Sequence, residues 1–194
     1  MSSQALERQS QPFYQIWFSV LTKPKADNYR RILETNGCSV LHAYMWLIAC
    51  LLLFGTFYFF ARNLLDLSIA QIISGVLTIA IYFSVQVFAT HLGSRVLGGF
   101  GTYSELVYLA AAYYVPLLAL GSLIELVLIV FSIDLTFSLS DPLYLFMAVL
   151  SVVAVKAVHH FKTGKAIVSA IIIPTIVMFL FRFVIPLLLF PDMF

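Results

Sequence analysis

Four histidines are the side chains best suited to metal chemistry, but their spacing does not form a metal motif. His159 and His160 are adjacent, so on a helix they point about 100° apart and cannot easily share one ion. His42 and His91 belong to other segments and could complete a ligand set only through the fold. The sequence has no His-Glu-x-x-His, no Cys-x-x-Cys and no cluster of carboxylates. We therefore expect solvated histidines, with no metal and no cofactor bound.

A glycine-rich stretch, Gly98-Gly99-Phe100-Gly101, could bind a phosphate, because exposed N–H groups at a helix start attract anions. The P-loop pattern is absent, however, and Thr163-Gly164-Lys165 lacks the upstream glycine that this pattern requires. We expect these glycines to permit a tight chain reversal. Ser104 would then cap the helix that follows, with Glu105 near the positive end of its dipole.

Nucleophile motifs are equally weak. The sequence has no Gly-x-Ser-x-Gly, and no Ser-His-Asp set stands out from background. Together with the histidine and glycine patterns, this predicts a protein without enzymatic activity.

The segments that carry these residues are too apolar for a water-soluble domain. Of the 194 residues 62% are hydrophobic and 10% are charged, and the mean hydropathy is +1.00. Soluble domains carry about 25% charged residues. The composition therefore predicts an integral membrane protein. A net charge of +2, with scattered cations, argues against a nucleic-acid partner.

Apolar runs long enough to span a bilayer recur along the chain. A spanning helix needs about 20 residues at about 1.5 Å rise each. Five runs meet this length: 40–61, 68–91, 104–131, 142–160 and 165–190. The sequence thus predicts an all-α bundle of five transmembrane helices over residues 40–194, preceded by a segment of residues 1–39.

The preceding segment contains an amphipathic pattern that Pro24 ends. Its apolar residues share one helical face: Phe13, Ile16, Trp17, Val20 and Leu21. In one interpretation the helix lies at the membrane interface, with Trp17 at headgroup level and Lys23 and Lys25 near lipid phosphates. In the other, the same face packs on the ends of the bundle. The sequence leaves both open.

Two charges fall inside predicted spans at similar depth. Glu125 and Arg182 lie about six and eight residues from the outward ends of their spans, so their depths agree to within about 3 Å. We expect an intramembrane ion pair, since an isolated charge in hydrocarbon is costly. A structural clamp is favoured over a polar transport path. Pro116, Pro174 and Pro186 would kink their helices, which favours transport only slightly.

The order of motifs resembles a known family. The shared segments are Leu21-Thr22-Lys23-Pro24 after Trp17, the glycine-rich Leu97–Glu105, Tyr113-Tyr114-Val115-Pro116 and the basic turn Val158–Ala166. This pattern is similar to the Yip family, membrane proteins named for interaction with Ypt/Rab GTPases, and to its short prokaryotic branch in particular. Eukaryotic members generally have longer cytosolic amino-terminal regions than the 39 residues found here.

The resemblance implies five spans and a cytosolic amino terminus. It also implies a non-enzymatic scaffold, recruitment, membrane-organising or membrane-trafficking factor, in the plasma membrane of a prokaryote or in Golgi and endoplasmic reticulum membranes of a eukaryote. The alternative is a small transporter or channel component that uses Glu125 and Arg182.

The partners expected are the lipid bilayer and a protein. Ala166 and Ala170 form a small-residue face that favours close helix packing, either within the chain or with a partner. The protein partner would bind through such a face or through the cytoplasmic loop residues Gly98, Gly99, Gly101, His159, His160 and Lys162.

The distribution of cations makes topology the first testable prediction. Nine of the eleven Lys and Arg residues lie on one side of the five predicted spans. By the positive-inside rule this side is cytoplasmic and the carboxyl terminus is outside. Tags at Ser2 and Arg95 should be accessible only from the cytoplasm, and a tag after Phe194 only from outside. A cytoplasmic carboxyl terminus would rule out five spans.

Overall fold

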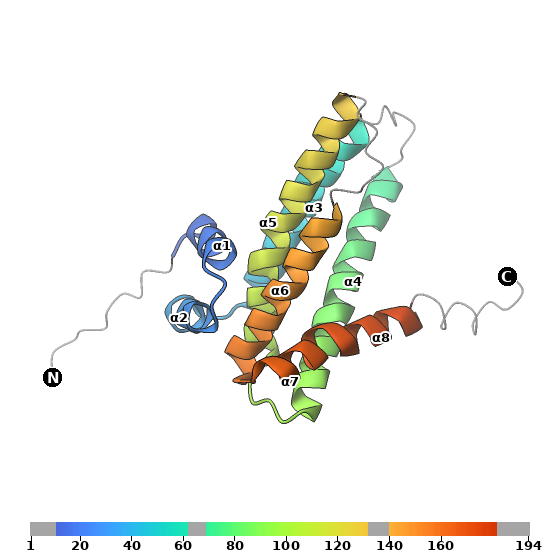
Figure 1. The fold of residues 1–194 in the computed structure, drawn as a ribbon. Coiled ribbons are helices and arrows are strands. Elements are labelled where there is room, and N and C mark those ends of the chain that lie inside the picture. Colours follow the sequence, from blue (N-terminus) through green and yellow to red (C-terminus); the bar gives the residue numbers. More distant parts are fainter. Residues whose placement is uncertain (1–10, 62–68, 132–139, 182–194) are drawn as a thin grey trace, which may run out of the picture.

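The computed structural model describes residues 11–61, 69–131 and 140–181, and every element in these ranges is a helix (Figure 1). The helices are α1 Phe13–Thr22, α2 Ala26–Asn36, α3 Val40–Ala61, α4 Ile69–Val96, α5 Tyr103–Val130, α6 Ser140–His159, α7 Thr163–Ile167 and α8 Ile173–Phe179, with a π-helical turn η1 at Val168–Ile172 between the last two. The all-α prediction is confirmed for these residues.

Three of the described helices are long and apolar enough to cross a membrane, at Ile73–Val96, Tyr103–Ile124 and Pro142–His159. A fourth candidate is Ala26–Asn36 taken together with Val40–Leu53, which are bent by 106°. The apolar helix at Thr163–Phe179 is shorter. The described part of the chain thus holds three or four candidate spans, and the count of five stays a prediction.

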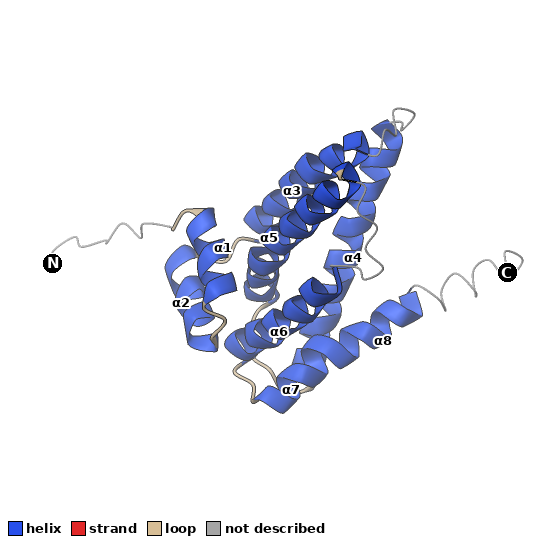
Figure 2. Cartoon of the chain, turned by 45° about the horizontal axis from the view of Figure 1, so that its top comes forward, coloured by secondary structure: helices blue, strands red, loops and turns tan. Residues whose placement is uncertain are grey.

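Helix α5 is the centre of the bundle, because α1, α2, α3, α4 and α6 all contact it. Its segment 106–113 is buried throughout, and three alanines at 110–112 let neighbouring helices approach closely. Helices α3 to α6 run side by side, while α8 leaves the bundle at an angle (Figures 1 and 2). The outward faces of the long helices remain apolar and exposed, as for helices in contact with lipid.

The small residues of the last segment pack within the chain. Ala166 and Ala170 are buried, and the Ser169 hydroxyl is hydrogen-bonded to Ser94 and donates to the Thr90 carbonyl at 3.0 Å. These contacts tie η1 to α4. The predicted close-packing face is therefore used inside the molecule.

Helices α1 and α2 form a hairpin that packs on the bundle. Ile16 and Val20 are buried, and the Trp17 ring lies edge-on to Trp46 with centroids 6.1 Å apart. The Arg30 guanidinium donates to the carbonyls of Lys156 and Ala157 in the last turn of α6.

The Ile16 face of α1 therefore packs on protein, as the second interpretation expected. Phe13, at the start of the same face, is exposed, and so are Tyr14 and Phe18 on the rest of the helix. Lys23 and Lys25 are exposed too. A membrane-interface role for Trp17, Lys23 and Lys25 stays a prediction.

The turn between α1 and α2 depends on Tyr29. The Val20 carbonyl would ordinarily accept from the N–H four residues later, but that residue is Pro24, which has none. The buried Tyr29 hydroxyl donates to this carbonyl at 3.1 Å instead. The Asn28 side-chain amide donates to the carbonyls of Ser19 and Lys23.

We predict that Tyr29→Phe lowers the free energy of unfolding by about 1 to 3 kcal/mol, because it leaves a buried carbonyl without a donor. Thermal unfolding in detergent measures the change. Tyr14→Phe is the matched control, since Tyr14 is 58% exposed. Equal melting temperatures for the two variants would contradict this account of the turn.

Candidate functional site at one end of the bundle

Two loops that are far apart in the sequence interlock at one end of the bundle. They are the glycine-rich loop between α4 and α5 and the turn between α6 and α7. The Gly101 N–H donates to His159 Nδ1 at 3.1 Å, and Lys165 Nζ donates to the Leu97 carbonyl at 3.0 Å. The two loops therefore form one surface, which we call the loop platform.

Three glycines of this platform serve two different purposes. Gly98 has φ of 87°, a left-handed conformation that favours glycine, which agrees with the predicted tight reversal. At Gly99 a Cβ atom would lie 2.7 Å from His159 Nδ1. At Gly101 it would overlap the Val158 carbonyl group. Gly99 and Gly101 are therefore needed for close approach to α6.

His159 is buried by this approach, so the expectation of a solvated histidine was wrong. Its side chain is 1% exposed, and its ring lies 5.8 Å from the Phe161 ring and 5.5 Å from the His91 ring. Because Nδ1 accepts from the Gly101 N–H, the proton of the neutral ring is on Nε2. Within the described residues Nε2 has no hydrogen-bond partner. A doubly protonated ring would lose the Gly101 bond.

The other histidines do not join His159 in a ligand set. His91 lies beside it on α4, but no group of three potential metal ligands occurs in ranges 11–61, 69–131 and 140–181. His160 is exposed, and its backbone has a left-handed conformation with φ of 55°, which often follows the end of a helix. His42 is exposed on α3.

The start of α5 is capped by Thr102, so the expectation that Ser104 caps it was wrong. The Glu105 N–H donates to Thr102 Oγ1 at 3.3 Å, and the Thr102 N–H donates to Glu105 Oε2 at 2.8 Å. Ser104 is inside the first turn of α5. This reciprocal capping box has a sequence signature, Thr-x-x-Glu, that predicts the correct cap.

The Cys38 thiol is affected by the same end of α5. Burial raises the pKa of Cys38 to about 11, and the Glu105 carboxylate adds to the rise. The thiol is therefore protonated at neutral pH and is a poor nucleophile.

Exposed cations and apolar side chains share the platform. Phe100 is 84% exposed and Val96 is 86% exposed at the loop, an arrangement typical of a binding surface when polar groups surround it. The exposed cations nearby are Arg95, Lys162 and Lys165.

The predicted intramembrane pair cannot be placed. Glu125 belongs to α5, but its side chain and Arg182 lie outside the described residues. The ion pair remains a prediction, and the transport alternative gains no support from the described residues.

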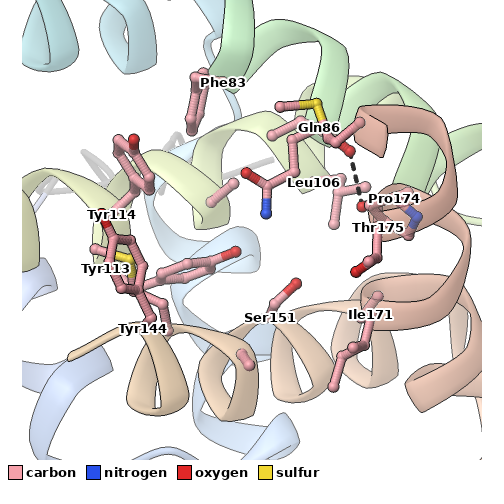
Figure 3. Close-up of a pocket in the computed structure, with 17 residues that line it drawn as sticks. Phe83, Gln86, Leu106, Tyr113, Tyr114, Tyr144, Ser151, Ile171, Pro174 and Thr175 are labelled. Carbon is pink, nitrogen blue, oxygen red and sulfur yellow. Dashed lines mark hydrogen bonds between the residues drawn. The ribbon is translucent and has the colours of Figure 1, made fainter. Parts of the chain in front are cut away.

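A cavity of about 350 Å³ lies between α4, α5, α6 and the η1–α8 segment (Figure 3). Its lining comes from all of these elements and includes Gln86, Tyr113, Ser151 and Thr175. The sequence analysis did not identify this site, since each helix contributes only a few residues to it.

One comparison with known proteins identifies a family. The family model described as the Yip1 domain matches residues 18–184. The match covers most of the chain and confirms the resemblance drawn from the sequence motifs. No curated protein and no solved structure matches the chain.

The glycine contacts lead to a matched pair of variants. Gly101→Ala should lower the free energy of unfolding by about 1 to 3 kcal/mol, because a Cβ atom would overlap the backbone of Val158. Gly164→Ala in the adjoining α7 should be neutral or stabilise the protein by up to about 1 kcal/mol, since nothing lies within 4 Å of its Cβ position. Thermal unfolding in detergent compares them, and equal effects would refute the close-approach argument.

Proposed function

This chain belongs to the Yip1 domain family of membrane proteins, and we propose that it acts without catalysis, as a scaffold, recruitment or membrane-organising factor. The loop platform is its binding surface. The partner is a protein that approaches from the cytoplasm.

The exposure of Phe100 on a held loop is the observation that carries this proposal. Hydrogen bonds from Arg95 to the Gly99 carbonyl, from the Gly101 N–H to His159 and from Lys165 to Leu97 hold the loop on both sides of Phe100. A pre-organised loop loses little conformational entropy on binding. Phe100 then serves as an aromatic anchor for an apolar pocket on the partner.

The charge of the platform indicates what surrounds that pocket. Arg95, Lys162 and Lys165 are exposed near Phe100, so an acidic rim on the partner complements them and accelerates encounter. By contrast, the His159 imidazole is enclosed by packing partners, which supports a binding role over a catalytic one.

The proposed topology places this platform in the cytoplasm. It has the five spans expected from the apolar runs. The positive-inside rule then gives a cytoplasmic amino terminus and an external carboxyl terminus. The hydrogen bonds of Arg30, Arg95 and Lys165 to the ends of α6 and to the 97–99 loop support it, because they gather cations at one end of the bundle. The membrane is the plasma membrane of a prokaryote. The exposed rings of Phe13, Tyr14 and Phe18, with Trp17, Lys23 and Lys25, anchor the hairpin at the interface.

Site-specific crosslinking in native membranes tests the proposal. A photoreactive residue at position 100 should capture a partner, whereas one at position 131 should not. Phe131 is also exposed, at 69%, but it follows the far end of α5. In affinity capture, Phe100→Ser should reduce recovery of that partner by about tenfold or more, as expected for loss of an aromatic anchor. Phe131→Ser is the control.

Lys162→Glu should also reduce recovery, and the effect should weaken in high salt because the charge interaction is screened. Equal capture by the wild-type chain and the Phe100→Ser variant would refute the platform as the binding surface.

A further inference from the structure

The cavity between α4, α5, α6 and α8 is a second candidate site, separate from the loop platform. Its volume of about 350 Å³ falls within the range of small-molecule sites. One wall is formed by the π-helical turn η1 together with Pro174, and π-helical turns occur frequently at functional sites.

The cavity lies at the depth of the hydrocarbon layer. Ser151 is about 12 Å along α6 from its end at His159, and Tyr113 is about 15 Å along α5 from its start at Tyr103. Both residues are therefore near the middle of a hydrocarbon layer about 30 Å thick. A ligand here comes from the bilayer.

Exposed residues of both α6 and α8 border the cavity. Helix α8 packs along α4, whereas α6 packs on α7 and η1, and α8 diverges from α6 (Figure 1). Among the lining residues, Tyr144 of α6 is 65% exposed, and Thr175 of α8 is exposed as well. A lipid molecule can therefore enter laterally from the membrane.

The polar groups around the cavity are all uncharged. Seven lining residues carry a hydroxyl or an amide: Gln86, Thr90, Tyr113, Tyr114, Tyr144, Ser151 and Thr175. Tyr113 and Ser151 are more than nine-tenths buried. The Gln86 carboxamide projects into the cavity (Figure 3), and Gln86 is an exposed residue of α4. Among the lining residues that the structure describes, none is a charged type.

The uncharged polar lining argues against two kinds of occupant, a charged headgroup and a plain acyl chain. A phosphate headgroup at this depth would find no cation to neutralise it, and an uncompensated charge in hydrocarbon is costly. A plain acyl chain would leave the Gln86 carboxamide without a partner, which is also unfavourable. The occupant that satisfies both conditions is an uncharged amphiphile with oxygen acceptors and a hydroxyl.

We propose that this cavity binds an uncharged glycerolipid of the diacylglycerol class. The ester carbonyls of the lipid accept hydrogen bonds from the Gln86 side-chain amide and from the tyrosine and serine hydroxyls. The free hydroxyl of the lipid donates to Oε1 of the Gln86 side chain. One acyl chain leaves through the gap between α6 and α8, and Met147 and Met178 adapt to its shape.

A photoactivatable diacylglycerol tests the proposal on the full chain in lipid nanodiscs. Labelling should map to the cavity walls, at 144–151 on α6 and 171–178 on the η1–α8 segment. Each neutral hydrogen bond lost should weaken labelling by about 2- to 12-fold. The double variant Gln86→Leu, Ser151→Ala should therefore lose about tenfold or more. The matched control is Ser74→Ala, Thr78→Val, which removes two exposed hydroxyls of α4 outside the cavity.

Two competitors test the proposed chemistry. Unlabelled diacylglycerol should displace the probe. Phosphatidic acid with the same chains, and a long-chain alkane, should both displace it at least tenfold less well. Equal competition by phosphatidic acid would overturn the proposal that the cavity prefers an uncharged lipid. Equal competition by the alkane would overturn the role of the polar groups.

A variant that fills part of the cavity provides a second test if the double variant does not fold. Ala148→Met narrows the cavity from α6 and retains all seven polar groups, so it should reduce labelling as well. Unchanged labelling in a folded cavity variant would overturn the proposal. Crosslinking from position 100 does not involve the cavity, so that experiment and this one can fail independently.

Discussion

The close approach of the glycine-rich loop to the last turn of α6 organises one whole end of the molecule. A side chain on Gly99 or Gly101 would overlap His159 or the Val158 backbone, so the contact exists only because both positions are glycine. The approach encloses His159 and lets its Nδ1 accept the Gly101 N–H. It also brings exposed cations from α4 and α7 onto one surface with Phe100.

Helix ends in this bundle are completed by residues from other segments. The guanidinium of Arg30 on α2 donates hydrogen bonds to carbonyls at the end of α6, and Lys165 donates to the Leu97 carbonyl after α4. Tyr29 replaces the donor that Pro24 lacks. Terminal helix carbonyls have no partner within their own helix, so each of these bonds also fixes one element against another. Packing and hydrogen bonding therefore reinforce the same arrangement.

The segment from α7 to α8 connects the two candidate sites. Its first residues carry Lys165, which binds the glycine-rich loop, and its π-helical turn packs on α4 through Ser169 and Ser94. Farther along, Pro174 and Thr175 line the cavity. One continuous stretch of chain thus borders an exposed, charged surface and an uncharged lateral cavity. The two environments differ because the first is at the ends of the helices and the second is enclosed between their middle segments.

The sequence alone determined the membrane class, the all-helical structure, the family and the reversal at Gly98. These properties depend on composition or on the conformation of a few consecutive residues, which a linear pattern contains. The sequence also contained the signal for the cap of α5. The pattern Thr-x-x-Glu at Thr102 and Glu105 predicts the observed cap, whereas the choice of Ser104 as the cap residue was wrong.

Only the tertiary structure decided that His159 is buried, that α1 packs its Ile16 face on the bundle, and that Gln86 and Ser151 share a cavity. Each of these depends on which distant segments meet, and that is set by packing across the whole bundle.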